Sequence, residues 1–307
     1  MLIVVALGGN ALLRRGQKMT VDLQRENILA ATRSLAKLVR AGHRIVITHG
    51  NGPQIGLIAL QAAAGPSDGT YPLDVLGAES EGMIGYLIEQ ELGNQLGSAT
   101  LAATLLTQTL VNAEDPAFQQ PTKPIGPQYD EAMARKLEQE RGWRFKLDGS
   151  HWRRVVPSPK PLRILESPVI SMLVNLGVIV ICTGGGGIPV IRRADGTLIG
   201  VEAVVDKDLA SAMLADVIKA DFLMLLTDVD GVYLDFDSEA PRRLKRIAPG
   251  ELPLDQFPAG SMRPKLEAAM EFVQGSGRKA AIGRLEQAEE IVSGNAGTLI
   301  SAQGAGR

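Results

Sequence analysis

Two lysines of this 307-residue chain stand beside acids and helix starts, where a cation can be held for chemistry. Lys207 lies between Asp206 and Asp208, whose carboxylates would keep it charged and anchor it, and Asp208 could also orient a second lysine. Lys265 follows Pro264, a residue that often opens a helix. Phosphoryl transfer needs alignment and cations over the transferring group, and little covalent help from the protein. The pattern therefore favours a phosphoryl-transfer centre.

Each of these residues also has a plainer interpretation. Asp206 or Asp208 could simply cap a helix, and Lys265 could be a solvated surface residue. Taken one at a time, the residues favour these plainer alternatives. Taken together with the glycine pattern described next, they favour a phosphoryl-transfer site.

Three short runs of β-branched and apolar residues end at glycines. They are Leu2–Leu7 before Gly8-Gly9-Asn10, Arg44–Thr48 before His49-Gly50-Asn51-Gly52-Pro53, and Val178–Thr183 before Gly184-Gly185-Gly186-Gly187. Each pattern predicts a buried strand of a parallel sheet, a glycine turn and a helix start. Glycine lets a backbone approach a ligand closely, and the free N–H groups of a helix N-terminus attract anions. Three such turns predict a site that surrounds a strongly anionic ligand from several sides.

Other enzyme chemistries find little support in the chain. It has no H-E-x-x-H metal motif and no Walker A sequence, and its glycine runs miss G-x-G-x-x-G. The three histidines, His43, His49 and His151, lack metal-ligand spacing and an evident carboxylate partner. His49 lies in the second glycine turn and could be functional, but a structural hydrogen bond to the backbone of the turn is the favoured role. Phosphoryl transfer without a P-loop remains.

The composition predicts a globular protein whose anion binding is local. Apolar residues make up 45% and aromatic residues 4% of the chain, and the formal net charge is −2. So few aromatics disfavour a stacking surface for single-stranded nucleic acid. The chain also has no global basic field for nucleic acid or anionic membranes. We therefore expect neither a nucleic-acid nor a membrane partner.

The single cysteine and the first residues indicate a cytoplasmic location. Cys182 cannot form an internal disulfide, and its apolar surroundings in sequence predict a buried, inert thiol. The first residues lack a basic region and a cleavage site, and Leu2–Leu7 is too short to span a membrane. We expect a cytoplasmic enzyme.

Strand and helix patterns alternate over most of the chain, which predicts an α/β fold with a doubly wound, mainly parallel sheet. The ligands of such sheets bind at the carboxyl ends of the strands. Helical spacing marks residues 23–39, 53–62, 75–96, 164–176, 207–218 and 265–274. Strands are expected at 2–7, 44–48, 100–106, 178–183, 222–226, 280–282 and 298–300, with a hairpin at 188–201 that turns at Asp195-Gly196.

Residues 112–163 break this alternation. Seven of the 17 prolines fall there, with ten Lys and Arg among seven acids and one plausible helix from Asp130 to Arg141. A stretch this long without strong periodicity is usually functional or a linker. We interpret it as a small excursion from the sheet that could act as a lid, with a plain solvated insertion as the alternative.

Long motifs across nearly the whole chain resemble those of the carbamate kinases, a branch of the amino acid kinase family. They occur in order and at the family's spacing. They are Ala6–Leu12, Thr48–Gln54, Pro121–Pro127, Arg153–Pro159, Gly184–Pro189, Gly200–Ser211, Leu226–Tyr233 and Gly260–Met262. Many relatives in the wider family carry a lysine before the first glycine pair, where this chain has Ala6-Leu7. This departure favours a carbamate kinase over acetylglutamate, aspartate or uridylate kinases.

The resemblance implies a three-layer αβα sandwich with an open, mainly parallel central sheet and a small protruding subdomain, in one domain over residues 1–307. Residues 1–200 would form the lobe for carbamate or carbamoyl phosphate, including the excursion 112–163, and residues 201–307 the nucleotide lobe. The implied reaction is reversible: ATP and carbamate give ADP and carbamoyl phosphate, with Mg²⁺ carried by the nucleotide. It usually runs toward ATP in catabolism, and homologous enzymes are homodimers.

The resemblance also implies a role for each candidate residue. Lys207 and Lys265 would neutralise the transferring phosphoryl group, with Asp208 organising both. The carbamoyl phosphate end would be held by Gly9, Asn10, Gly50, Asn51, Gly52, Lys123, Gly185 and Gly186. The nucleotide site would be lined by Thr227, Asp228, Asp230, Gly231, Tyr233 and Met262. Arg263 stands where the family usually has a small or apolar residue, and it would point to solvent or add a cation beside the ATP phosphates.

Two alternatives stay open at this point. One is another small-acid kinase on the same scaffold. The other is a catalytically silent sensor of nucleotide or carbamoyl phosphate. The presence of all four candidate charged residues, Lys123, Lys207, Asp208 and Lys265, argues against the sensor, because a binding module has less need of them.

Overall fold

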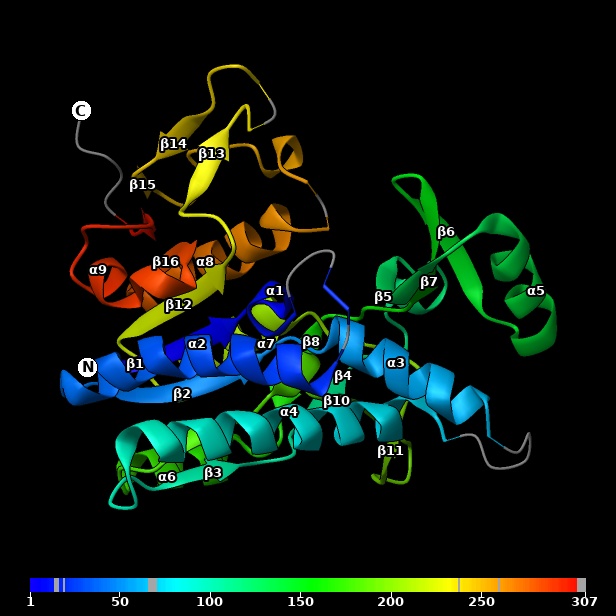
Figure 1. The fold of residues 1–307 in the computed structure, drawn as a ribbon, viewed down its shortest axis with the longest axis horizontal. Helices are drawn as coiled ribbons and strands as arrows, with labels where there is room; N and C mark the ends of the chain where they lie inside the picture. The colour runs from blue at the N-terminus through cyan, green and yellow to red at the C-terminus, as the bar shows by residue number, and fades with distance from the viewer. Residues whose placement is uncertain (14–16, 19, 66–70, 237, 259, 303–307) are drawn as a thin grey trace.

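An eight-stranded sheet crosses the centre of the protein (Figure 1). The computed structural model describes residues 1–13, 17–18, 20–65, 71–236, 238–258 and 260–302, without the side chains of Asn10 and Ala11. From one edge to the other the strands are β15 (Arg246–Ile247), β17 (Thr298–Ile300), β16 (Lys279–Arg284), β12 (Phe222–Thr227), β1 (Leu2–Leu7), β2 (Arg44–His49), β9 (Ile179–Ile181) and β3 (Ala102–Thr104). All neighbours are parallel except β16 and β17.

Helices cover both faces of this sheet. The side chains of β1 are all buried and alternate between two hydrophobic clusters, with Ile3 and Val5 in one and Val4 and Ala6 in the other. The first cluster is completed by α2 (Val21–Arg40), α4 (Leu73–Leu96) and α9 (Ala288–Val292). The second is completed by α6 (Ser167–Asn175), α7 (Lys207–Val217) and α8 (Met262–Ser276). The expected three-layer αβα sandwich with a mainly parallel sheet is confirmed.

Two smaller sheets and a hairpin extend from this body. One sheet has the order β11 (Leu198–Gly200), β10 (Ile188–Arg192), β4 (Gln108–Val111) and β8 (Pro161–Ile164). The other consists of β5 (Lys123–Tyr129), β7 (His151–Val156) and β6 (Arg144–Asp148). The hairpin pairs β13 (Val232–Leu234) with β14 (Arg242–Leu244). Short helical turns are α1 (Gly9–Leu12), η1 (Pro116–Phe118), η2 (Gly184–Gly186), η3 (Leu254–Gln256) and η4 (Leu285–Gln287).

The sheet of β5, β7 and β6 projects from the body together with α5 (Glu131–Arg141), at the right of Figure 1. We call these four elements the protruding subdomain. Asp130 caps α5 by accepting a hydrogen bond from the Met133 N–H at 2.7 Å, and Gly142 ends it with a φ of 65°. The excursion expected over residues 112–163 therefore contains regular structure built on local signals.

The helix α3 (Gly52–Ala63) supports the protruding subdomain. A Cβ on Gly56 would lie 1.9 Å from the Cα of Gly126, so the backbones of α3 and β5 meet with no side chain between them. Beside this contact, Ile55 of α3 packs in one cluster with Ile125 and Val156 of the subdomain. This close approach fixes the position of β5, and therefore of its first residue, Lys123, relative to the rest of the protein.

The third glycine turn does not lead into a helix, so the helix start predicted there is wrong. Thr183, Gly185, Gly186 and Gly187 have φ values of 54°, 64°, 95° and 86°. Residues with positive φ cannot continue a right-handed helix. The chain makes the single turn η2 and enters β10 instead.

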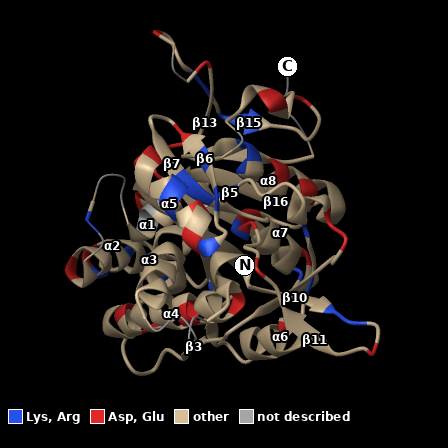
Figure 2. Ribbon diagram, turned by 90° about the vertical axis from the view of Figure 1, so that its right-hand side faces the viewer, with Lys and Arg blue, Asp and Glu red and all other residues tan. Residues whose placement is uncertain are grey.

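Charges of opposite sign lie beside one another on the surface, as the two colours on α5 show (Figure 2). There Arg135 lies 3.5 Å from Glu131 and 2.8 Å from Glu138. No helix in the described part of the chain combines the length and apolar character needed to cross a membrane.

Candidate active site

Four neighbouring strands of the central sheet carry the candidate residues at their carboxyl ends. In sheet order these are β9, β2, β1 and β12, which lead into Gly184, Gly50, Gly8 and Asp228. The ligand of an open parallel sheet binds at this edge. The sheet order therefore collects glycine turns that are far apart in the sequence.

The first two glycine turns meet at a lysine. A Cβ on Gly50 would lie 3.1 Å from the Gly9 nitrogen, 3.3 Å from the Gly9 Cα and 3.6 Å from Cδ of Lys207. Gly52 begins α3, whose first N–H groups have no partner within the helix. The side chain of Asn10 lies outside the described residues. Backbone donors and a lysine side chain are thus gathered in one place, as an anion requires.

The third turn contacts the second through Asn51. A Cβ on Gly185 would lie 2.2 Å from Asn51 Nδ2, so only glycine leaves room for this side chain. Asn51 Nδ2 donates a hydrogen bond to Ser80 Oγ at 2.8 Å, and Ser80 Oγ donates to the Gly77 carbonyl at 2.7 Å. Gly186 follows Gly185 in the same turn. Asn51 is therefore held between the glycine turn and α4.

Asp206 caps the start of α7 and has two sets of hydrogen-bond partners. Its Oδ1 accepts hydrogen bonds from the N–H groups of Asp208 at 2.9 Å and Leu209 at 3.4 Å, which is the capping role considered from the sequence. Its Oδ2 accepts from Lys123 Nζ at 2.5 Å. Because Lys123 begins β5, this ion pair ties the protruding subdomain to the start of α7. Both residues were candidates in the sequence, but their pairing was not predicted because 83 residues separate them.

Asp208 lies between two lysines. Its Oδ1 accepts from Lys207 Nζ at 2.6 Å, and its Oδ2 accepts from Lys265 Nζ at 2.8 Å. The exposed fractions of the three side chains are 5% for Asp208, 11% for Lys207 and 12% for Lys265. Lys265 is therefore not the solvated surface residue of the plainer interpretation.

Burial and mutual charge set the protonation of this trio. Burial would raise the pKa of Asp208, but the two lysines outweigh it and hold that pKa well below its ordinary value. Burial lowers the pKa of Lys207 to about 8, with the charge of Lys265 acting in the same direction and Asp208 opposing both. Burial also acts to lower the pKa of Lys265, yet Asp208, with smaller contributions from Asp206 and Asp228, raises it overall. Below pH 8 the trio carries two positive charges and one negative, an excess that a phosphate would neutralise.

Two hydroxyls that sequence reasoning missed connect β2 to the first turn of α7. Thr48 Oγ1 and Ser211 Oγ lie 2.6 Å apart, and Ser211 Oγ donates to the Lys207 carbonyl at 2.5 Å. Both residues lie within the motifs that carry the family resemblance. Their place in these motifs was the sequence feature that could have identified them.

Most of the residues predicted for the nucleotide lie at or just after the end of β12. Thr227 Oγ1 donates to Asp228 Oδ1 at 3.0 Å. Asp230 accepts from the Tyr233 hydroxyl at 2.8 Å and from Arg243 Nη1 at 2.9 Å, so Arg243 is a further charged neighbour that the sequence did not single out. These side chains are organised by one another at the carboxyl end of β12.

Gly231, Met262 and Arg263 complete this part of the molecule. A Cβ on Gly231 would lie 2.8 Å from Thr298 Oγ1, and Met262 begins α8 and packs against a core cluster. Arg263 donates to the backbone carbonyl oxygen of Asp255, within η3, at 2.8 Å and to that of Phe257, just after η3, at 3.2 Å. Its guanidinium is therefore bound to the protein backbone.

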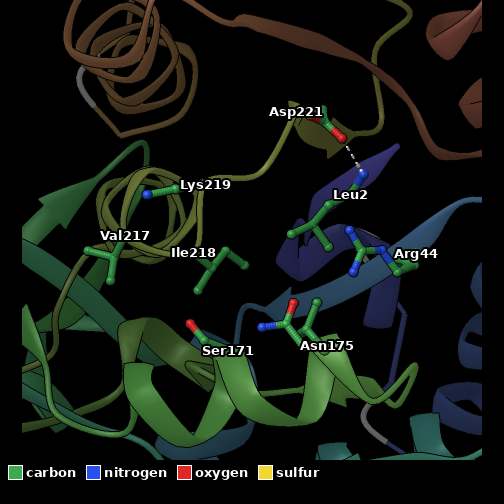
Figure 3. A pocket seen from close by; sticks show the side chains of 9 residues that line it. Leu2, Arg44, Ser171, Asn175, Val217, Ile218, Lys219 and Asp221 are labelled. Atoms are coloured by element: carbon green, nitrogen blue, oxygen red, sulfur yellow. Dashed lines mark hydrogen bonds between the residues drawn. The ribbon is translucent and has the colours of Figure 1, made fainter.

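A cavity of about 380 Å³ lies at the amino ends of the central strands, opposite the candidate residues. It is lined by Leu2, Arg44 and Asp221 at the amino ends of β1, β2 and β12, and by the last residues of α6 and α7 (Figure 3). Asp221 Oδ2 accepts from the Leu2 N–H at 2.7 Å (Figure 3). The trio of Lys207, Asp208 and Lys265 lies at the carboxyl ends of the strands, so this cavity is not part of the candidate site.

Comparison with known proteins agrees with this geometry. The model of the amino acid kinase family matches residues 1–284. The chain belongs to the amino acid kinase family. Within it, the chain is 52% identical over 303 residues to the carbamate kinase of Rhizobium meliloti (strain 1021), covering 98% of this chain and 93% of the relative. It is 49% identical to the carbamate kinase of Haemophilus influenzae, covering 98% of this chain and 97% of the relative.

A solved structure shows the same arrangement. The carbamate kinase from Giardia lamblia bound to AMP-PNP is 40% identical, covers 98% of each chain and superposes with a TM-score of 0.87. The family, the fold and the enzyme class expected from the sequence, a carbamate kinase, are thereby confirmed, and neither alternative gains support.

Proposed function

We propose that this amino acid kinase performs its carbamate kinase reaction, ATP and carbamate to ADP and carbamoyl phosphate and the reverse, at the trio of Lys207, Asp208 and Lys265. The observation that carries the proposal is the position of Lys207. Its Cδ lies beside the Gly9 and Gly50 turns, while its ammonium group shares the Asp208 carboxylate with Lys265. Lys207 therefore lies beside the glycine turns and is also a member of the buried trio.

The carbamoyl phosphate end lies, in this proposal, at the first two turns. Gly9, Asn10 and the segment 50–52 supply donors there, with Gly185 and Gly186 on the far side of Asn51. Lys123 reaches the same place from β5, exchanging its Asp206 partner for the phosphate. Residues 1–200 then form the lobe for the small acid, including the excursion 112–163.

The nucleotide lies against residues 201–307 in this proposal. Thr227, Asp228, Asp230, Gly231, Tyr233 and Met262 surround it beyond β12. The support is that Asp228 is close enough to Lys265 to raise its pKa and that Met262 begins the helix that carries Lys265, together with the AMP-PNP bound to the similar Giardia lamblia enzyme. The phosphates of the nucleotide then point toward Lys207 and Lys265.

The trio stabilises the negative charge of the phosphoryl group during its transfer. A carbamate oxygen attacks the γ-phosphorus of ATP, and the bond to the ADP oxygen breaks. The attacking oxygen carries no proton, so the step needs no general base. Negative charge spreads over the equatorial oxygens, where the two ammonium groups stabilise it. Asp208 keeps both lysines charged and correctly spaced.

Mg²⁺ enters with the nucleotide in this proposal. Mg²⁺ in kinase sites is held mainly by substrate phosphates with one or two carboxylates. Asp228, which is close enough to Lys265 to raise its pKa, is the carboxylate that fits this role. When bound, the ion neutralises phosphate charge.

A homodimer through the β3 edge is the assembly we propose. In the described part of the chain no strand pairs with the outer side of β3. Leu101, just before β3, is 62% exposed, and Met172 and Leu176, in and just after α6, are 62% and 71% exposed. Open edges and apolar patches of this kind are normally covered. A second copy of the chain offers the same edge and the same patch in return.

Sedimentation tests this assembly. The wild type should sediment as a dimer and Met172→Lys with Leu176→Lys as a monomer, while Leu198→Lys, an exposed apolar residue on β11, should leave the dimer intact. A wild type that sediments as a monomer would overturn the proposed assembly.

One assay tests the proposed reaction. ADP and carbamoyl phosphate with Mg²⁺ should yield ATP, detected by luciferase. Tight binding of both ligands without ATP would favour a silent sensor. ATP consumption with a different small acid, and none with carbamate, would favour another kinase.

A further inference from the structure

Glu81 is a buried acid that no step of the proposed reaction uses. It lies on α4, and only 2% of the residue is exposed. Its Oε2 accepts a hydrogen bond from the Thr107 N–H at 2.9 Å. Its Oε1 has no hydrogen-bond partner within the described residues. A carboxylate in this position would leave one charged oxygen buried and unpaired.

Glu81 and His49 contact the same point of the third glycine turn. A Cβ on Gly184 would lie 2.4 Å from His49 Cε1, 2.6 Å from His49 Nε2 and 2.8 Å from Glu81 Cγ. Thr183, just before it, has a φ of 54°, which is unfavourable for a β-branched residue. The Thr183 N–H donates to Thr107 Oγ1 at 3.0 Å. Thr107 and Glu81 together therefore support a turn that is locally strained.

His49 brings no positive charge to this place. Its Nδ1 lies 3.1 Å from the Gly50 carbonyl, which can only accept, so Nδ1 carries the hydrogen. Burial lowers the pKa of His49 to about 4, with Lys207 acting in the same direction and the Gly50 hydrogen bond opposing. The imidazole is neutral at the pH of catalysis.

The other groups that face Glu81 also offer no cation. Burial raises the pKa of Glu81 well above its ordinary value, and the charge of Glu166 acts in the same direction against the hydrogen bond from Thr107. Glu166, at the start of α6, accepts from the backbone and side-chain nitrogens of Gln108 at 2.7 and 3.0 Å. Cys182, the residue after β9, is a thiol whose pKa burial raises to about 12.

We propose that Glu81 is a positioning residue of the phosphoryl-transfer site, an uncharged carboxylic acid that holds the Thr183–Gly186 turn against Asn51. The inference rests on the proposed placement of carbamoyl phosphate at these turns. The neutral acid accepts through Oε2 and carries its hydrogen on Oε1, so it supports the turn without adding negative charge. An ionised group of the same shape would repel the phosphate that Asn51 and Gly185 face.

Infrared spectroscopy tests the protonation directly. At pH 8 the wild type should show the carbonyl band of a protonated carboxyl group, and Glu81→Gln should lack it. Glu89→Gln is the matched control: Glu89 lies on the same helix and accepts from Thr104 Oγ1 at 2.7 Å. The band should persist in that variant. A wild-type spectrum without the band would overturn the proposal.

Melting curves give a second readout that does not depend on activity. Because the pKa of Glu81 is raised in the folded protein, its contribution to stability is full below the unfolded value and declines as the pH rises toward the folded value. Glu81→Gln removes this decline. Relative to the wild type, its Tm should rise by about 2 °C per pH unit between pH 5 and 8. A constant difference between the two proteins over this range would contradict an uncharged Glu81.

Kinetics separate positioning from mere folding. Glu81→Gln should keep kcat and the KM for carbamoyl phosphate within about twofold, because an amide can accept from Thr107 and fill the same space. Glu81→Ala should raise that KM by about tenfold and leave the KM for ADP near its normal value, because it removes the support of a buried hydrogen bond.

Two kinetic results would overturn the positioning role. In one, the Gln variant loses as much activity as the Ala variant. In the other, the Ala variant keeps a normal KM for carbamoyl phosphate. If Glu81→Ala does not fold, the kinetics of Glu81→Gln, the infrared spectra and the melting curves still test the proposal. Absence of ATP formation by the wild type would instead reject the proposed function and leave the infrared and melting results valid.

Discussion

Lys265 and Asp208 form an ion pair of 2.8 Å between Nζ and Oδ2, although 57 residues separate them in the chain. The pair joins the start of α8 to the start of α7, and the other oxygen of Asp208 holds Lys207. One buried carboxylate thus sets the spacing of two ammonium groups. This spacing is what a phosphate between them would meet.

Removing either ammonium group should slow the reaction greatly. Lys265→Ala and Lys207→Ala should each lower kcat by about 10²–10³, by analogy with the loss of one oxyanion donor. ATP formation from ADP and carbamoyl phosphate measures the effect, with circular dichroism to check the fold. Lys136→Ala, which removes an exposed lysine of α5, serves as the control and should have normal turnover. Near-normal turnover in either active-site variant would reject the trio as the reaction centre.

The pH profile should show the titration of Lys207. A lysine is charged below its pKa, which burial lowers to about 8 here, so kcat/KM for carbamoyl phosphate should fall above this pH. Bound phosphate favours the charged form, so the corresponding fall in kcat should lie at higher pH. Lys207→Arg keeps its charge and should lose the alkaline fall in kcat/KM. An unchanged profile in that variant would assign the titration to another group.

The ion pair of Lys123 should matter for one substrate only. Lys123→Ala should raise the KM for carbamoyl phosphate by about tenfold or more, the effect of losing a charged hydrogen bond, and change the KM for ADP little. Initial rates at varied concentrations of each substrate measure this difference. Lys160→Ala, an exposed lysine in the same excursion, is the matched control. Equal changes in both KM values would instead indicate a general structural defect.

Two glycine-to-alanine variants should have opposite effects on stability. Gly56→Ala places a methyl group 1.9 Å from the Gly126 Cα, so it should lower the free energy of unfolding by about 1–3 kcal/mol and raise the KM for carbamoyl phosphate. Gly82 lies on α4, and a methyl group added there would meet nothing within 4 Å, so Gly82→Ala should stabilise by about 0.4–1 kcal/mol. Urea unfolding of both variants measures the two values. A stable, fully active Gly56→Ala would show that the subdomain tolerates displacement.

Most strands and helices could be predicted because their signals are local. The central strands are short apolar runs, and α5 has an aspartate at its start and a glycine at its end. The third glycine turn was predicted less well. Its conformation depends on distant residues, since Gly185 makes room for Asn51 and Gly187 for Thr109. A local pattern of glycines cannot distinguish a helix start from such a turn.

The chemical groups of this protein can be identified from the sequence alone: three glycine turns, lysines beside acids, and motifs whose family resemblance names the reaction. Which of these groups are partners depends on the tertiary structure. Lys123 meets Asp206 across 83 residues, and Glu81 meets Thr107 across 26. Such pairs depend on the order of strands in the sheet and on the depth of burial. Burial raises the pKa of Glu81 and acts to lower the pKa of both lysines, but at Lys265 the neighbouring carboxylates outweigh it.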